Sequence, residues 1–152
     1  MAATYFKPNG ARQVFPCWDE PELKTIYNIS VMHHQKYLVL SNMQMQKQVM
    51  GKDDMIQTYF DFTSPIPTYL VAIVIIPKCD FYHRSNYNQT VNIWCNLSLL
   101  SQVTFIYNIA EKVVQFMIQY TNKSEEISKM DHVLIPNFPV DGMENWGLIT
   151  YK

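Results

Sequence analysis

Hydrophobic and polar positions alternate over much of the first hundred residues. In residues 25–33 the side chains of Tyr27, Ile29 and Val31 share one face of an extended chain, and Asn28 lies on the other face. This period of two predicts a strand with one buried face. Strands are also predicted at residues 37–41, 55–62 and 89–95. The continuous apolar run at 68–76 predicts a further strand that is buried on both faces.

The period changes from two to 3.6 near residues 96–104. From Phe105 to Tyr120 apolar residues recur every three or four positions, which predicts an amphipathic helix of about four turns. We expect the aromatic-rich face of this helix to be core. Further strands are predicted at residues 132–135 and 146–151.

Three segments lack either period and are predicted to be loops, turns or boundaries: residues 1–21, 42–54 and 77–88. The order of the elements indicates a mixed α+β fold. It reads as the C-terminal part of an antiparallel β-sheet domain, followed by the opening helix and strands of a second unit.

Composition supports a folded domain and narrows the class of partner. The chain has 152 residues, of which 48% are hydrophobic and 16% charged, so a packed core is expected and disorder is not. A net charge of −1 without a basic block gives no electrostatic reason to expect a nucleic-acid partner. The apolar run ending at Ile76 is far shorter than the about 20 residues of a transmembrane helix. We also expect no signal segment after Met1.

Glycosylation sequons point to a secretory protein. The pattern N-x-[ST] begins at Asn28, Asn88, Asn96 and Asn122, and Asn28 lies on the polar face of its predicted strand. An extracellular or plasma-membrane-associated location is therefore expected for the parent protein, meaning the full-length protein that would contain this chain.

The cysteine and histidine positions predict no metal site. Cys17, Cys79 and Cys95 show no zinc-ligand spacing, so free thiols are favoured and a Cys79–Cys95 disulfide is left open. No H-E-x-x-H motif is present, and the adjacent His33 and His34 would face opposite sides of a strand. We therefore predict neither catalytic residues nor a bound cofactor in this chain.

Two blocks of sequence carry a resemblance to a known family. Residues 2–29 read AATYFKPNGARQVFPCWDEPELKTIYNI, and residues 132–152 read HVLIPNFPVDGMENWGLITYK. Together they resemble the aminopeptidase N family of zinc exopeptidases, the gluzincin aminopeptidases. The resemblance implies that residues 1–81 are part of an N-terminal β domain. It implies that residues 82–152 open a thermolysin-like catalytic domain and stop before the zinc motif, so that zinc is implied only for the parent.

The resemblance also assigns roles to the segment Asp141–Asn145. In the family, the glutamate of a G-x-M-E-N loop pairs with the α-ammonium of the substrate, and Glu144 matches it. Gly142 and Met143 would pair with the peptide main chain, and Asn145 completes the motif. Asp141 departs from the family's glycine and adds a carboxylate beside the substrate path. We expect Trp146 to pack beneath this loop.

A second departure concerns the N-terminal domain. Alignment on Ala11-Arg12 and Phe15-Pro16-Cys17 places Tyr5 and Lys7 where the family has Gln-x-Glu or Gln-x-Gln, a pair that helps to hold the substrate amine. Lys7 would bring a cation to the place of an ammonium, which predicts weakened or altered peptidase activity. A slip in the alignment, or an error in the gene model near Met1, is the other explanation.

Other charged residues near this segment are interpreted as structural. Arg12, Asp19 and Glu20 lie in a turn flanked by prolines, where charged side chains commonly hold the backbone.

The sequence thus predicts a fragment or truncated member of a family that removes N-terminal amino acids from peptides. Its expected partners are the N-terminus of a peptide substrate and the missing remainder of the fold. On its own the chain is expected to be inactive. The alternative is a non-catalytic peptide-binding or interaction paralogue.

Overall fold

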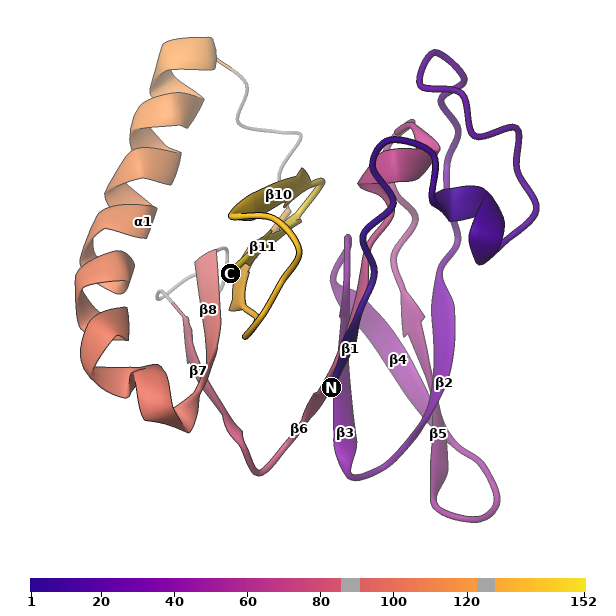
Figure 1. Cartoon of the computed structure of the whole chain (residues 1–152), viewed down its shortest axis with the longest axis horizontal. Coiled ribbons are helices and arrows are strands. Elements are labelled where there is room, and N and C mark those ends of the chain that lie inside the picture. Colours follow the sequence, from indigo (N-terminus) through magenta and orange to yellow (C-terminus); the bar gives the residue numbers. More distant parts are fainter. Residues whose placement is uncertain (86–90, 123–127) are drawn as a thin grey trace.

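The computed structural model describes residues 1–85, 91–122 and 128–152, and arranges them in three sheets and one long helix (Figure 1). Two sheets have three strands each, in the orders β1-β6-β3 and β2-β5-β4, and the third has the order β10-β11-β9-β8-β7. The strands are β1 (Ala2–Ala3), β2 (Ser30–His34), β3 (Tyr37–Ser41), β4 (Met45–Met50), β5 (Met55–Phe60), β6 (Ile73–Pro77), β7 (Phe81–Ser85), β8 (Val91–Asn96), β9 (Met130–Leu134), β10 (Gly142–Asn145) and β11 (Leu148–Tyr151).

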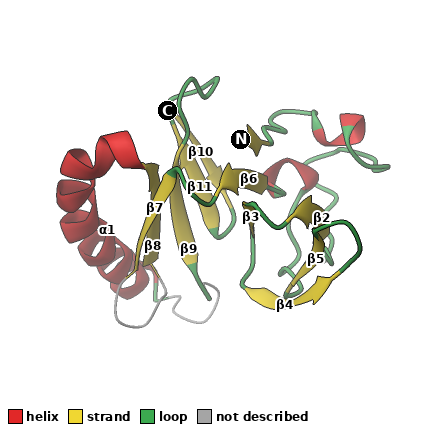
Figure 2. Ribbon diagram, turned by 90° about the horizontal axis from the view of Figure 1, so that it is seen from below, coloured by secondary structure: helices red, strands yellow, loops and turns green. Residues whose placement is uncertain are grey.

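The helices lie between these strands in the chain. The α-helix α1 (Leu100–Thr121) has 22 residues, and the short 3-10 helices are η1 (Ala11–Gln13), η2 (Thr68–Leu70) and η3 (Leu97–Leu99). In Figure 2 α1 lies against the outer side of the five-stranded sheet, and the two small sheets lie on the other side. The small sheets are antiparallel, whereas β11, β9 and β8 run parallel to one another. The predicted mixed α+β class is confirmed.

Three apolar clusters hold these layers together. The central one joins β3 and β6 to the five-stranded sheet and includes Val74, Ile76, Val133 and Leu148, none of them exposed. A second cluster lies between the two small sheets, and a third lies between α1 and the sheet around Ile93. The central cluster therefore joins the two halves of the chain and fixes the last hairpin against β3 and β6.

Several predicted boundaries were wrong. The strand predicted at 25–33 begins only at Ser30, although the burial of Ile29 and the exposure of Asn28 follow the predicted faces. The run 68–76 starts with the 3-10 helix η2 and becomes a strand at Ile73. The segment 42–54 contains β4, and 77–88 contains β7. All six residues of β4 are exposed, so no apolar period marks it.

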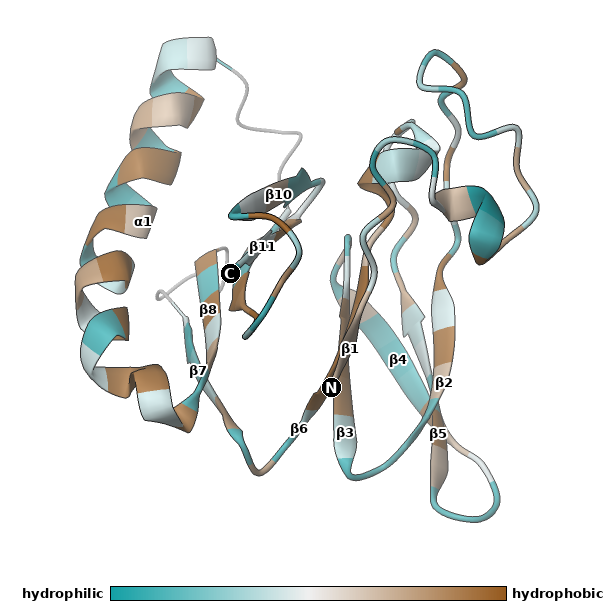
Figure 3. Ribbon diagram, viewed as in Figure 1, coloured by the Kyte–Doolittle hydropathy of each residue, from teal (hydrophilic) through white to brown (hydrophobic). Residues whose placement is uncertain are grey.

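The prediction that the helix face is core was also wrong. The helix exists and is longer than predicted, but Phe105, Phe116 and Tyr120 are 71%, 61% and 77% exposed. In Figure 3 hydrophobic and hydrophilic bands alternate along α1. Of this helix only Val103 and Ala110 are buried. Phe105, Val113 and Met117 instead line a hollow between α1 and the five-stranded sheet.

Candidate functional site

The segment 141–145, predicted to be a loop, is mostly a strand. Gly142 to Asn145 form β10, which pairs antiparallel with β11 so that Glu144 lies opposite Ile149. Burial alternates along it: Met143 and Asn145 are 1% and 3% exposed, whereas Glu144 points outward. Since β10 is an edge strand of its sheet, its outer backbone can accept an added strand.

Glu144 is held by a cation from the other end of the chain. The Lys7 Nζ donates to Glu144 Oε1 at 2.9 Å, across 137 residues of sequence. Both side chains are about half exposed, at 49% and 63%. The hydrogen bond and the charge of Glu144 raise the pKa of Lys7, and Lys7 lowers the pKa of Glu144 through the same contact. Both groups therefore carry their charges at neutral pH.

The backbone around Lys7 is held in place by its neighbours. Phe6 is buried in the cluster between the two small sheets, and Tyr5 makes an edge-to-face contact with Phe138 at 5.9 Å between ring centroids. Three residues before Lys7, Thr4 exchanges hydrogen bonds with Ile73 of β6. The structure thus brings Lys7 into contact with Glu144 of the hairpin, and packs Tyr5 on the central cluster that contains Met143.

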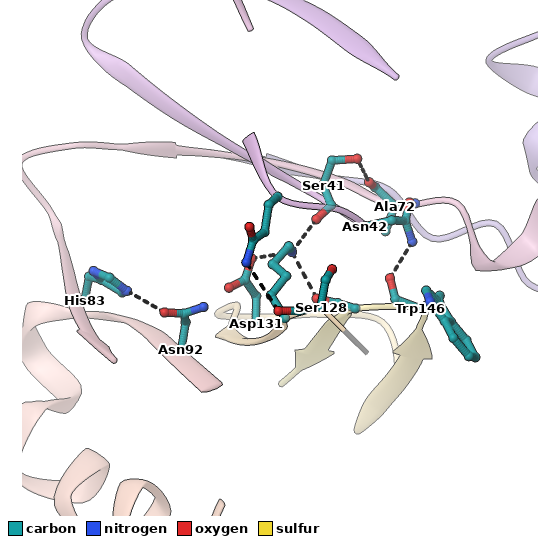
Figure 4. Close-up of polar contacts among 11 residues, drawn as sticks. Ser41, Asn42, Ala72, His83, Asn92, Ser128, Asp131 and Trp146 are labelled. Carbon is teal, nitrogen blue, oxygen red and sulfur yellow. Dashed lines mark hydrogen bonds and ion pairs between the residues drawn. The ribbon is translucent and has the colours of Figure 1, made fainter. Parts of the chain in front are cut away.

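A buried polar network joins the same hairpin to the N-terminal sheets (Figure 4). Asn42 has no exposed surface, and its Nδ2 donates to the carbonyl oxygens of Leu70 and Trp146, both at 2.7 Å. Its Oδ1 accepts from the backbone N–H of Ala72 at 2.9 Å. One amide side chain therefore ties η2, the start of β6 and the β10–β11 turn together.

Lys129 makes the second connection. It is 6% exposed, and its Nζ donates to the Ser41 carbonyl and to Asp131 Oδ2, each at 2.6 Å, and to the Gly147 carbonyl at 3.0 Å. Burial lowers the pKa of Lys129, and the charge of Asp131 opposes this. Gly147 has φ of 68°, and a Cβ there would collide with the Asn42 carbonyl oxygen, so this turn requires glycine. We call Asn42, Lys129 and Asp131 the clasp.

The clasp was missed by sequence reasoning. Asn42 lies 87 residues before Lys129 and 89 residues before Asp131 (129 − 42 and 131 − 42). None of the three is part of a catalytic or metal-binding motif. The signal that could have found it is the lysine two residues before an aspartate in an apolar strand, because buried charges are rarely found without a partner.

Of the three charged residues predicted to be structural in the N-terminal turn, Arg12 and Asp19 hold the backbone there. The Arg12 backbone N–H and Nε both donate to Asp19 Oδ2 at 3.2 Å, and the Thr68 hydroxyl donates to Oδ1 at 2.7 Å. The hydrogen bond from Thr68, helped by Arg12, lowers the pKa of Asp19. Glu20 is exposed. Trp146 is half-buried and packs on the cluster between the small sheets.

A large hollow lies away from Glu144. It has a volume of about 1010 Å³, is mainly apolar and runs between α1 and the five-stranded sheet, with Asp141 at its rim. Neither Glu144 nor Lys7 lines it. We place the candidate site on the geometry of the ion pair and the edge strand, because Glu144 and its ammonium partner lie outside this mainly apolar hollow.

No metal site is formed by the residues that the structure describes. Among residues 1–85, 91–122 and 128–152 there is no group of three or more His, Cys, Asp or Glu side chains placed to hold an ion. Cys17, Cys79 and Cys95 are free thiols in the structure, with Cys79 exposed and Cys95 buried.

Comparison with known proteins identifies the family. Residues 1–70 match the family model of the Peptidase M1 N-terminal domain, and residues 105–152 match that of the Peptidase family M1 domain. The chain belongs to the M1 peptidase family. The two matches flank the boundary predicted between residues 81 and 82, which stays a prediction.

Individual M1 relatives agree with this over the whole chain. Endoplasmic reticulum aminopeptidase 1 of Mus musculus is 35% identical over 100% of the chain. Aminopeptidase Q of Homo sapiens is 36% identical over 99%, and glutamyl aminopeptidase of Rattus norvegicus 34% over 100%. The chain spans 16% of the length of each of these relatives.

Proposed function

We propose that this chain is the amine-recognition part of a zinc metallo-aminopeptidase, which removes N-terminal amino acids from peptides. In this proposal Glu144 pairs with the α-ammonium of the substrate through a charge-assisted hydrogen bond. The observation that carries it is the Lys7–Glu144 contact: the carboxylate lies half exposed on an edge strand and already binds an ammonium nitrogen at 2.9 Å.

The neighbours of Glu144 have separate tasks in the proposal. The exposed edge of β10, at Gly142 and Met143, would pair with the substrate backbone as an added strand. The buried side chains of Met143 and Asn145 anchor that strand, so the carboxylate projects from a fixed backbone. Asp141 is exposed beside it and would add negative charge to the substrate path.

Zinc belongs to the proposal only for the parent protein. Because no group of three or more His, Cys, Asp or Glu side chains among the described residues is placed to hold an ion, we assign to these residues only the binding and orienting of the peptide. The zinc and the hydrolysis are left to the remainder of the fold, which is proposed as the partner of this chain.

The location and the glycans are also proposed for the parent protein, as extracellular or plasma-membrane-associated. Asn28 and Asn122 are exposed, which a glycan requires, and the Asn96 Oδ1 accepts hydrogen bonds from Ser98. Asn88 lies outside the described residues. Within the part of the chain that the structure describes, no helix is long and apolar enough to cross a membrane.

The alternative of a non-catalytic peptide-binding paralogue is not favoured. The relatives named above are all called aminopeptidases, and none of the contacts in the hairpin favours that alternative.

The test is the substitution Glu144→Gln in the full-length protein that carries this chain. Loss of one charge-assisted hydrogen bond to the substrate predicts a fall in kcat/KM on aminoacyl anilides of about tenfold to a hundredfold. The matched control is Glu22→Gln, which removes an exposed carboxylate from a loop. If Glu144→Gln and Glu22→Gln retained the same activity, Glu144 would not bind the amine.

A further inference from the structure

The carboxylate proposed to bind the substrate amine is already paired with a cation, Lys7. A lone carboxylate would attract any peptide N-terminus, but here an ammonium already lies at 2.9 Å from it. A substrate α-ammonium that reaches Glu144 enters within a few ångströms of the Lys7 ammonium. The two like charges repel each other unless a further negative group lies between them or Lys7 moves away.

A first residue with an acidic side chain supplies that negative group. Its α-ammonium can contact Glu144 while its own carboxylate contacts Lys7, so each cation has an anion beside it. Aspartate and glutamate carry both groups within one residue, a few bonds apart. A neutral first residue instead leaves Lys7 without the oxygen that it holds in the free protein.

We propose that Lys7 makes this site selective for peptides whose first residue is aspartate or glutamate. The inference rests on the proposed role of Glu144 and adds the class of substrate. Lys7 suits the role because its backbone is fixed by the buried Phe6 and by Tyr5 on Phe138, while its ammonium stays half exposed. The charged end can therefore meet a ligand from solvent at a defined place.

The test compares two peptides that differ only in charge. Pentapeptides of one sequence that begin with Glu or with Gln are offered to the full-length protein carrying this chain, and kcat/KM and the calorimetric Kd are both measured. We expect kcat/KM to be about five- to tenfold higher for the Glu peptide. This ratio corresponds to a contact whose strength lies between that of an exposed ion pair and that of a charge-assisted hydrogen bond. The preference should shrink when salt is raised.

Variants assign the preference to Lys7. Lys7→Gln should bring the Glu/Gln ratio to one or below, because the acidic side chain then meets only negative charge. The control Lys24→Gln removes an exposed lysine from a loop and should leave the ratio unchanged. A ratio of one or less in the unaltered protein, or a preference that survives in Lys7→Gln, would overturn the proposal.

Failure of this proposal can be told apart from failure of the proposed function. If Glu144→Gln weakens both peptides equally while the Glu/Gln ratio is one, the amine site stands and the acidic preference is wrong. If the protein hydrolyses neither peptide, the peptidase function is contradicted, and the Kd values still decide the preference. Equal Kd values would then refute it.

Discussion

The clasp makes a quantitative prediction about Lys129. Its ammonium is buried, at 6% exposure, and donates to Asp131 and to two carbonyl oxygens, those of Ser41 and Gly147. Lys129→Met keeps the length of the side chain but leaves the Asp131 carboxylate buried, at 3% exposure, without its cation. Removing one partner of a buried ion pair costs about 3–5 kcal/mol of unfolding free energy, a large part of the 5–15 kcal/mol typical of a domain.

Urea unfolding of the 152-residue chain measures this loss. With a slope of about 2 kcal/mol per molar urea, the midpoint should fall by roughly 1.5–2.5 M. The control Lys52→Met alters an exposed lysine in the β4–β5 turn and should change the midpoint little.

A double variant separates the unpaired charge from the lost packing. Lys129→Met with Asp131→Leu removes both charges, so the chain should recover most of the lost stability, and only the two carbonyl oxygens remain without their donor. A loss below about 1 kcal/mol in Lys129→Met, or no recovery in the double variant, would refute the reasoning.

Three further outcomes are expected. Gly147→Ala should lower the unfolding free energy, measured with urea, by at least about 2 kcal/mol, because φ is 68° and the added Cβ would collide with the Asn42 carbonyl oxygen. The control Gly51→Ala should lower it clearly less, and equal losses would contradict the argument. Burial lowers the pKa of His132 below 6.5, so the unfolded chain binds the proton more readily, and stability should fall as the pH falls from 6.5 towards about 5. His132→Gln should flatten that dependence, and an unchanged slope would rule His132 out as its source. Lys7→Glu should raise activity on substrates with a neutral first residue, measured as kcat/KM in the full-length protein; no change would contradict the predicted effect of the lysine.

The sequence predicted strands best where one face of a strand is buried. In β5 the burial alternates residue by residue, and the predicted strand at 55–62 differs from it by two residues at one end. In β4 every side chain is exposed, so hydrogen bonding to β5 makes the strand without any apolar signal. In β10 the burial also alternates, but one of its two buried residues is the polar Asn145, so four residues carry no apolar pattern. The strand is formed by pairing with β11. Pairing with a neighbouring strand is not visible in the hydrophobic pattern of one segment.

The candidate site was predictable in part. Alignment with the family singled out both Glu144 and Lys7. No local pattern connects residues that are 137 positions apart, so their contact is seen only in the structure. What each residue does to a substrate stays a prediction. Of the clasp, only the Lys129–Asp131 pair left a signal in the sequence. The other partners of Asn42 and Lys129 are mostly backbone carbonyls, and the type of residue that carries a carbonyl says nothing about where it lies.

The exposed apolar side chains of α1 show the limit of periodicity. A period of 3.6 places Phe105, Phe116 and Tyr120 on one stripe, but it does not say how much of that stripe a sheet will cover. The helix was therefore predictable, whereas its burial was not.

The central claim is that Glu144 binds the α-ammonium of a peptide. A crystal structure of the full-length protein with a bound peptide tests it most directly. The account predicts the peptide nitrogen within about 3.2 Å of a Glu144 carboxylate oxygen, with the peptide backbone along the edge of β10. A bound peptide whose amine lies elsewhere, while Glu144 still contacts only Lys7, would contradict the account.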